Sequence, residues 1–324
     1  MENLREIDTI ELTERAAVIP VTVIIPVRNE AQNLPRCLGA LRDFSEVYVI
    51  DSQSSDETVE IARSHHAKVV QFHYRGAWPK KRQWAMDTLT IANDWILLLD
   101  ADESPSPALV NDIRCAIQNP AVNGYYIRLQ SWFLGRALRH GDVSLWKLSL
   151  FRQNKGRFEC RLQGQDASMA DMEVHEHVLV DGATAKLRHP LMHRNVASLS
   201  RYIRKHDEYS NWECRVLLQA ADGNQLPPAL FGTQAQRRRW LKRKLFTIPG
   251  SPVLLFLYRY FLRLGFLDGV PGLIYCGFQA VQMFDTKAKI YELKQYELKQ
   301  HELKKNELKQ KEISVKSKND ESYA

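Results

Sequence analysis

The sequence predicts an α/β fold whose centre is a mainly parallel, doubly wound sheet. Short runs of apolar and β-branched residues alternate four times with segments of helical character, within about a hundred residues. Such alternation is typical of parallel βαβ units with right-handed crossovers. In these sheets ligands bind at the carboxyl ends of the strands. The residues that follow each predicted strand are therefore the first place to search for a site.

The strands are predicted from four apolar runs, and each run is followed by a helical signal. Leucines at helical spacing follow the first run, and Ser54 and Glu57 have the spacing of a capping box after the second. A third helix is expected over residues 78–92, and a fourth is expected to begin near Pro105 or Pro107. The four runs are VTVIIPV (21–27), EVYVID (46–51), KVVQF (68–72) and DWILLLD (94–100).

The middle of the chain, roughly residues 120–190, changes character. Aromatic and basic residues interleave in strand-like segments that are separated by glycine-containing loops. We interpret this region as a mixed β extension of the sheet that builds an acceptor pocket. A helical pattern then covers about residues 195–221. The strand-like segments read YYIRLQSWFLGR, LWKLSLFR and VHEHVLV.

Three of the predicted strands end in carboxylates and small polar groups: PVRNE at 26–30, DSQSSD at 51–56 and DADE at 100–103. A glycine-rich phosphate loop is absent after the first strand, and no P-loop motif occurs anywhere, which disfavours dinucleotide-binding and P-loop proteins. Phosphates would then be bound through a divalent cation on Asp100 and Asp102, since carboxylate oxygens suit Mg²⁺ or Mn²⁺. The competing interpretation is a solvated strand end.

Composition favours a cytoplasmic location. The chain has 324 residues, of which 44% are hydrophobic, enough for a sizeable core. Its five cysteines are odd in number and form no CxxC pair, as expected of reduced thiols. The opening segment, MENLREIDTIELTER, lacks the basic and apolar regions of a secretory signal.

Basic charge and apolar residues gather together after residue 200. Residues 201–264 hold twelve Lys or Arg and four Asp or Glu, a balance of +8 within a net charge of +7. The apolar stretches that follow are shorter than the roughly 18–20 uninterrupted residues of a spanning helix. Basic residues beside aromatic and leucine-rich faces instead favour a helix in the interface of an anionic membrane. We therefore expect a peripheral protein at the inner face of the cell membrane, and no nucleic-acid partner.

The sequence near the end repeats with a period of five residues: YELKQ, YELKQ, HELKK and NELKQ, over 291–310. Five residues turn an α-helix by about 500°, so successive leucines shift by about 140°. This spacing excludes a heptad coiled coil, and we expect a polar, solvated, helical extension to which the sequence assigns no function.

These features divide the chain into five parts. In order they are an N-terminal extension (1–19), a first half of the α/β domain (20–130), a second half of that domain (131–225), a basic and apolar membrane-associating helical region (226–290) and a polar repeat tail (291–324).

The strand-end motifs resemble family 2 glycosyltransferases with a GT-A fold. The resemblance is carried by VTVIIPVRNEAQNLPRCL, EVYVIDSQSSDETVEIA and DWILLLDADE. WPKKRQWAM, EVHEHV and RYFLRLGFLDGVPGLIY resemble the branch of lipopolysaccharide-core β-1,4-glucosyltransferases, and the likeness extends over about residues 20–290. It implies an inverting, metal-dependent transfer of a sugar, with glucose as the first candidate. The donor would be a UDP-sugar, and the acceptor a lipopolysaccharide-core, lipid-linked or other cell-envelope glycan.

The resemblance makes residues 20–130 the nucleotide-sugar-binding half of the GT-A domain and residues 131–225 its acceptor-side half. It also implies roles for individual residues. Pro26 and Asn29 would lie near the nucleotide-sugar, Glu30 near the ribose, Asp51 at the uracil ring, and Lys81 at the base or diphosphate. Asp100 and Asp102 would form the DxD motif, with Asp102 on a Mg²⁺ or Mn²⁺ ion and Asp100 on the metal or the donor. His193 would complete the metal shell. Of the three basic residues Lys80, Lys81 and Arg82, one is expected on a solvated helix face.

An inverting transfer needs a base that takes the proton of the acceptor hydroxyl. Glu176 is the expected base by the resemblance, with Glu173 and Asp171 as competitors, because the Glu-Asp pair of many relatives is missing here. A zinc site at His175 and His177 is disfavoured by their spacing. A nucleotidyltransferase on a similar sheet and a non-catalytic membrane-bound scaffold are the alternative functions.

Overall fold

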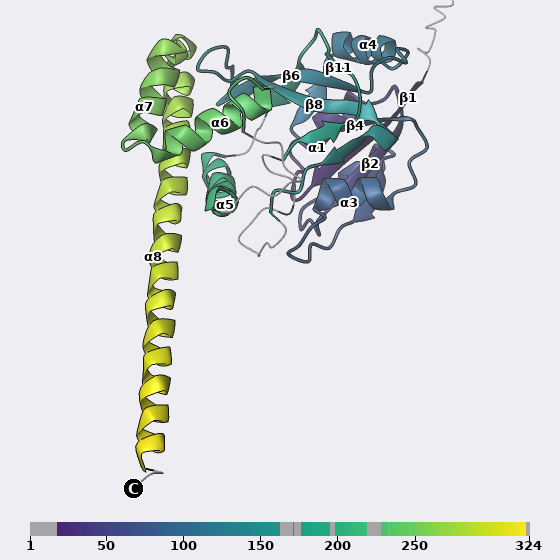
Figure 1. Cartoon of the computed structure of the whole chain (residues 1–324). Helices are drawn as coiled ribbons and strands as arrows, with labels where there is room; N and C mark the ends of the chain where they lie inside the picture. The colour runs from purple at the N-terminus through teal and green to yellow at the C-terminus, as the bar shows by residue number, and fades with distance from the viewer. Residues whose placement is uncertain are drawn as a thin grey trace, which may run out of the picture.

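The computed structural model describes residues 18–162, 171, 176–194, 198–218, 228–232 and 234–321. A strand-rich body carries a group of helices on one side, and one long helix runs away from both (Figure 1). Glu173, His175 and the first seventeen residues lie outside the described part.

The first half of the sheet is parallel, as predicted. Its strands lie in the order β3-β2-β1-β4, and Val27 at the end of one strand pairs with Asp51 at the end of the next. The carboxyl ends of these strands therefore share one edge. The bounds are β1 Ile19–Val27, β2 Phe44–Asp51, β3 Lys68–Gln71 and β4 Trp95–Leu98.

The second half is the expected mixed extension. β8 pairs antiparallel with β4 and with β6, and β12 pairs parallel with β6 and antiparallel with β5. This pairing returns residues near 190 to the end of β4. The bounds are β5 Glu103–Pro105, β6 Gly124–Phe133, β7 Arg136–Ala137, β8 Leu145–Arg152, β11 Thr184–Lys186 and β12 Leu191–Arg194. A separate two-stranded sheet pairs β9 Gly156–Phe158 with β10 Val178–Val180.

Short helices cover the sheet, and both faces of the central strands are buried. In β1, Val23 and Ile25 join one core cluster while Ile24 joins another on the opposite face, which explains why the run is continuously apolar. The Ser106 hydroxyl caps α4 by accepting the Leu109 amide at 3.2 Å. The helices are α1 Leu34–Gly39, α2 Thr58–Ser64, α3 Lys81–Thr88 and α4 Pro107–Ala116.

The predicted capping box is wrong. The helix starts at Thr58, with Glu57 in the capping position. The Ser54 hydroxyl instead donates to the Asp51 carboxylate, and the Asp56 carboxylate accepts the Thr58 amide at 3.1 Å. Because Ser54 is held at the strand end, it is not available to the helix.

The C-terminal part is helical. α5 Leu199–Leu218, α6 Gln234–Thr247 and α7 Ser251–Leu257 precede a π turn, Tyr258–Leu262, and a 3-10 turn, Gly265–Asp268. α8, Gly269–Glu321, continues through the five-residue repeat, which is helical as expected. None of the helices in the described ranges combines the length and apolar character needed to cross a membrane.

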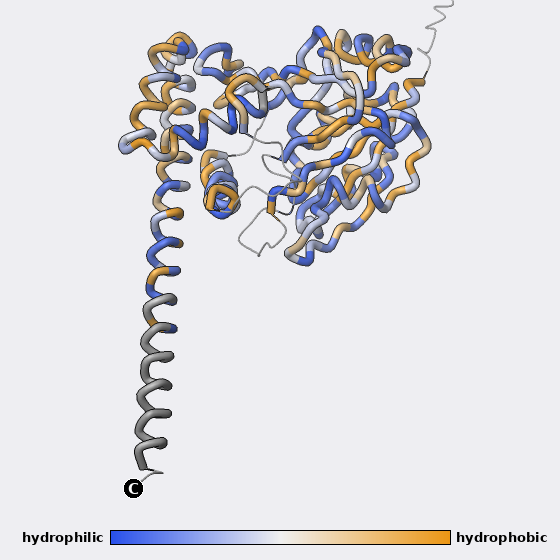
Figure 2. The backbone as a smooth tube through the Cα atoms, viewed as in Figure 1, coloured by the Kyte–Doolittle hydropathy of each residue, from blue (hydrophilic) through white to orange (hydrophobic). Residues whose placement is uncertain are grey.

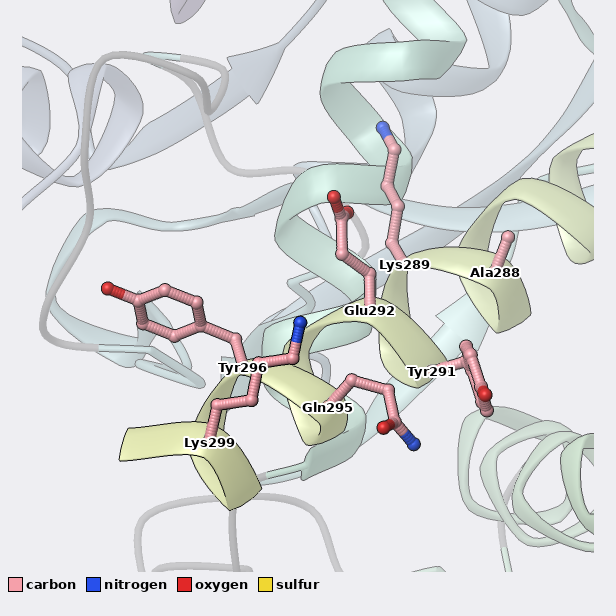
Figure 3. A pocket seen from close by; sticks show the side chains of 7 residues that line it. All are labelled: Ala288, Lys289, Tyr291, Glu292, Gln295, Tyr296 and Lys299. Carbon is pink, nitrogen blue, oxygen red and sulfur yellow. The ribbon is translucent and has the colours of Figure 1, made fainter. Parts of the chain in front are cut away.

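A shallow, open hollow of about 500 Å³ lies along α8 (Figure 3). In it Lys289 points toward α5 and donates to the Ser210 hydroxyl at 2.7 Å. The hollow therefore marks the packing of α5 on α8 and contains none of the predicted site residues. Its lining is Ala288, Lys289, Tyr291, Glu292, Gln295, Tyr296 and Lys299.

Candidate active site

The ends of β1 and β2 are joined by the side chain and backbone of Asn29. The backbone amide of Asn29 donates to the Ser54 hydroxyl, and its side-chain oxygen accepts from the Ser55 backbone amide, both at 2.8 Å. Asn29 has a φ of 55°, a left-handed conformation that asparagine tolerates better than most residues. The turn after β1 is thus fixed against the turn after β2.

Glu30 is the second predicted nucleotide-contacting residue of this turn. Its amide donates to the Thr58 hydroxyl at 2.8 Å, and its carboxylate accepts from Asn33 at 2.8 Å and from Arg201 at 2.7 Å. Burial raises the pKa of Glu30, against the opposing effect of these two partners. Glu30 is therefore a half-buried carboxylate beside a guanidinium group from α5.

Asp51 and Pro26 are more enclosed. Asp51 is 1% exposed, and its carboxylate accepts from the Ser54 amide at 3.1 Å and from Gln71 at 2.9 Å, besides the Ser54 hydroxyl. A carboxylate has about four acceptor positions, so these donors leave room for one more. Pro26 is buried within β1, opposite Ile50.

Asp102 and His193 form a pair just beyond the end of β4. The antiparallel pairing of β12 with β5 sets His193 opposite Glu103, and its Nε2 lies 3.3 Å from an Asp102 carboxylate oxygen. Burial alone would raise the pKa of Asp102, but the adjacent His193 lowers it to about 2. Conversely, burial would lower the pKa of His193, and Asp102 raises it to about 9. The structure thus brings together the two residues expected on the metal.

Asp100 lies between two cations. Arg82 of α3 contacts one carboxylate oxygen, and Lys147 of β8 donates to the other at 3.1 Å. Lys147 also donates to Glu103 at 3.0 Å, and Glu103 accepts the Asp100 amide at 2.9 Å. Burial opposes ionisation of Asp100, yet the two cations lower its pKa well below the ordinary range. Glu103, 1% exposed, fixes the turn that presents the two aspartates.

Asp102 and His193 could supply part of the ligand set of a divalent cation. Asp102 offers an oxygen donor, and His193 offers a nitrogen donor once the cation displaces its proton. Mg²⁺ or Mn²⁺ commonly completes such a site with water and substrate phosphate. Among the residues that the structure describes, no group of three Asp, Glu, His or Cys side chains is arranged to hold a metal, and Asp100 is paired with Arg82 and Lys147. Asp100 as a metal ligand stays a prediction.

The side chain of Lys81 reaches the end of β1. Its Nζ donates to the Val27 carbonyl at 2.9 Å and lies 3.0 Å from the Asp171 carboxylate. The Lys81 amide also donates to the Asp171 carbonyl at 3.2 Å. Burial lowers the pKa of Lys81, against the opposing charge of Asp171.

Glu176, the expected base, is fully buried. Its carboxylate lies 3.4 Å from the Lys80 ammonium, and neither side chain is exposed. Lys80 in turn lies over the ring of Trp212 from α5, 5.4 Å from the ring centroid. The competitor Asp171 has a side chain that is 14% exposed. The two carboxylates therefore differ in access, and Glu173 is outside the described residues.

The expectation that one of the three basic residues of α3 faces solvent is wrong. Lys80, Lys81 and Arg82 are 0, 1 and 5% exposed. Each is close to a carboxylate from another segment, Glu176, Asp171 or Asp100 respectively. The cluster therefore holds the site together instead of covering the surface.

Sequence reasoning missed the cations that converge on the strand ends. Arg201 contacts Glu30 across 171 positions of sequence. Tyr209 and then Asp102, with Glu30 and Asp100, raise the pKa of Lys205, so α5 brings a second positive charge to this edge. A local pattern could not reveal either residue, because both lie on a helix whose sequence carries no phosphate-binding motif.

The segment that contains the ends of β1, β2 and β4 matches a family of known proteins. Residues 22–178 match the family model described as glycosyl transferase family 2. Residues 22–178 are a glycosyl transferase family 2 domain. The GT-A fold expected of the family is confirmed, with its parallel half, its mixed extension and its C-terminal helices.

Curated relatives agree with this family but differ in extent. The chain is 24% identical over 287 residues to the lipopolysaccharide core biosynthesis glycosyltransferase LpsC of Rhizobium meliloti, covering 85% of this chain and 93% of the relative. A TPR repeat-containing protein of Synechococcus elongatus is 30% identical over 141 residues, 43% of this chain. An uncharacterized glycosyltransferase of Rickettsia bellii is 37% identical over 94 residues, 29% of this chain. The chain spans 33% and 31% of those last two proteins.

The comparison with solved structures also finds the mannosyltransferase PcManGT from Pyrobaculum calidifontis, in complex with GDP-Man and Mn²⁺. It is 15% identical, with a TM-score of 0.46, and the match covers 85% of this chain and 88% of that one.

Proposed function

We propose that the protein transfers a sugar from a UDP-sugar to a cell-envelope glycan acceptor, with inversion and with a divalent cation. The observation that carries the proposal is the Asp102–His193 pair at 3.3 Å, beside the joined ends of β1 and β2, within a family 2 domain. The acceptor class follows the printed name of LpsC, which covers most of this chain. Glucose is the proposed sugar, and a lipopolysaccharide-core or lipid-linked glycan is the proposed acceptor.

The joined turns after β1 and β2 are the proposed nucleotide site. Asp51 would accept the imide hydrogen of uracil at its remaining acceptor position, and Glu30 would bind the ribose. Asn29 fixes the turn itself, and Pro26, near the end of β1, would lie near the nucleotide-sugar. Lys81, anchored between the end of β1 and Asp171, would face the base or the diphosphate.

Asp102 and His193 are the proposed cation ligands, with Asp100 as the further candidate. The bound cation would stabilise the negative charge that develops on the departing nucleoside diphosphate. Arg82 and Lys147 hold Asp100 in place. Lys205 would add positive charge on the side of α5.

Of the two candidate bases, Asp171 is favoured over Glu176 because its carboxylate is more accessible to an acceptor hydroxyl. A general base has to come within hydrogen-bond reach of the acceptor hydroxyl, and Glu176 is enclosed and paired with Lys80. Asp171 is partly exposed beside Lys81. Glu176→Gln and Asp171→Asn distinguish them: the base variant loses turnover and keeps donor affinity, whereas loss of both properties marks a structural carboxylate.

We further propose that transfer takes place at the inner face of the cell membrane, with the protein bound peripherally to an anionic surface. The basic and apolar helices after residue 226 support this location. A nucleic-acid partner is not part of the proposal.

The test combines donor binding with turnover. UDP- and GDP-sugars are screened for thermal stabilisation with Mn²⁺ or Mg²⁺, since a ligand that binds only the native state raises the melting temperature. Hits are then assayed for transfer. Stabilisation by a UDP-sugar that needs the cation supports the proposal. Pyrophosphate release from a nucleoside triphosphate, with no sugar transfer, would replace it with a nucleotidyltransferase.

Asp102→Asn is the decisive variant, with Asp112→Asn as its matched control. Asp112 also pairs with a histidine, His189, at 2.9 Å, but on α4 and away from the strand ends. We expect Asp102→Asn to abolish cation-dependent transfer while Asp112→Asn retains it. Undiminished transfer by Asp102→Asn in the presence of chelator would refute the mechanism.

A further inference from the structure

Large apolar side chains are exposed in unusual density between residues 253 and 273. Leu262 is 76% exposed, and the others are 41 to 68% exposed. Figure 2 shows the apolar stretches along α7 and the adjoining part of α8. Contiguous exposed apolar surface marks an interaction site more often than a free surface. We call this set the apolar cap: Val253, Leu254, Leu257, Tyr258, Phe261, Leu262, Leu264, Phe266, Leu267, Val270 and Leu273.

The cap is a folded element with a packed inner side. An added Cβ at Gly272 would lie 2.2 Å from the Gly265 carbonyl oxygen, and one at Gly265 would lie 2.8 Å from Cys276 Sγ. Cys276 and Asp268 are buried beneath the same turns. The inner side is thus filled, so the exposed side chains cannot turn inward without unfolding the turns.

Basic residues adjoin the cap along the chain. On α6 the exposed positions Arg237, Leu241 and Lys244 are spaced by four and three residues, which puts them on one face of the helix. Ile248, the first residue after α6, is also exposed and continues this spacing. Ile248 then leads through two residues into α7 (Figure 1). A mixed basic and apolar stripe therefore runs directly into the apolar cap.

We infer that the apolar cap and the exposed stripe of α6 form the docking surface of the protein for an anionic bilayer. The inference deepens the membrane location in the proposed function and rests on that part of it. The cap enters the boundary of the acyl chains, and the stripe lies among the headgroups. Apolar area and attraction to anionic lipid together set the strength of such binding. The charge beside the cap favours this partner over a second copy of the chain, whose own stripe would repel it.

The cap is fixed to the acceptor-side strands. The Asp268 carboxylate accepts the amides of Arg139 and His140 at 3.0 and 2.9 Å. The Gly141 amide donates to the Arg263 carbonyl at 2.8 Å, and Arg259 donates back to the Gly141 carbonyl at 2.9 Å. The loop that contains these residues leads into β8, which carries Lys147. Docking would therefore set the orientation of the carboxylate edge relative to the bilayer.

Vesicle flotation of the full chain tests this inference. Leu262→Asp/Leu267→Asp removes apolar area from the cap, and Leu298→Asp/Leu303→Asp makes the same change on exposed leucines of α8 outside it. With vesicles containing phosphatidylglycerol, we expect the cap variant to partition at least about tenfold more weakly and the control to match wild type.

The contribution of basic residues to vesicle binding is tested with a second pair of variants. Arg237→Glu/Lys244→Glu should also weaken binding by about tenfold or more, while Lys294→Glu/Lys299→Glu, exposed on α8, should have little effect. Vesicles of phosphatidylcholine alone should bind wild type weakly. Equal binding to both vesicle types would overturn the inference, as would equal loss in variant and control.

Two further measurements separate the inference from its alternatives. If the cap instead pairs two copies, light scattering shows a dimer that Leu262→Asp/Leu267→Asp dissociates, with no vesicle binding by wild type, and the inference is overturned. The cap variant should keep cation-dependent donor binding, and Asp102→Asn should keep vesicle binding. Failure of sugar transfer alone would thus leave the docking surface standing, and failure of flotation alone would leave the chemistry standing.

Discussion

The pair formed by Lys80 and Glu176 should behave as one structural unit. The two charged groups lie 3.4 Å apart with both side chains fully buried, so removing either takes away an opposite charge that is close to the other. Breaking such a pair costs about 3–5 kcal/mol of unfolding free energy. We expect Lys80→Met and Glu176→Gln each to lose an amount in this range.

The double variant carries the sharper expectation. Because the double variant removes the two opposite charges together, Lys80→Met/Glu176→Gln should lose much less than the sum of the single losses. A coupling energy of at least about 2 kcal/mol is expected for groups in contact. Urea unfolding followed by circular dichroism measures all four proteins, and the slope of each transition checks that the unfolded states are comparable.

The exposed pair Lys155–Asp181, at 3.2 Å, provides the control cycle. Its side chains are 44% and 81% exposed, and such pairs contribute about 0–1 kcal/mol. The reasoning is refuted if Glu176→Gln unfolds at the wild-type urea concentration while transfer collapses. Glu176 would then be a base and not the counter-ion of Lys80.

Three other outcomes follow from the contacts described. Asp268→Ala should speed hydrogen exchange of the Arg139 and His140 amides, which donate to this carboxylate. Asp181→Ala, at an exposed position, should leave their exchange unchanged. Exchange at the wild-type rate in Asp268→Ala would mean that the loop is stable without this carboxylate. Burial raises the pKa of Asp268 but the His140 hydrogen bond lowers it below 3.8. Its stabilising contribution is therefore complete above that value and is lost as pH falls through the lower folded pKa, so urea midpoints of wild type and Asp268→Asn should converge on acidification. Burial raises the pKa of the Cys37 thiol far above its ordinary value, and mass spectrometry after iodoacetamide treatment should find exposed Cys115 labelled and Cys37 not; early labelling of Cys37 would contradict the packing.

Local sequence patterns were sufficient for the parallel half of the fold. The β-branched runs are buried on both faces, and strands buried in this way are continuously apolar, which is visible in the sequence. The capping box failed because a nearer acceptor, the Asp51 carboxylate, competes for the Ser54 hydroxyl. That competition depends on the turn geometry, which spacing does not specify.

Site residues could be predicted where they directly follow a buried strand in the sequence. They could not be predicted from local patterns where contacts between distant segments bring them to the site. Asp100 and Asp102 were found because a buried run ends in them. His193 came only from the family resemblance, since its position depends on the pairing of β12 with β5. Lys80 was read as a candidate surface residue because its partner, Glu176, comes from a segment almost a hundred positions later.

The length of α8 allows the tilt of the membrane-bound protein to be measured. Its 53 residues extend roughly 80 Å at about 1.5 Å per residue. A donor dye at the far end of α8, with acceptor dyes in the lipid, would report whether that end stands off the bilayer or lies along it. Because the dye is remote from both the cap and the carboxylates, the tilt of the bound protein can be measured while sugar transfer proceeds.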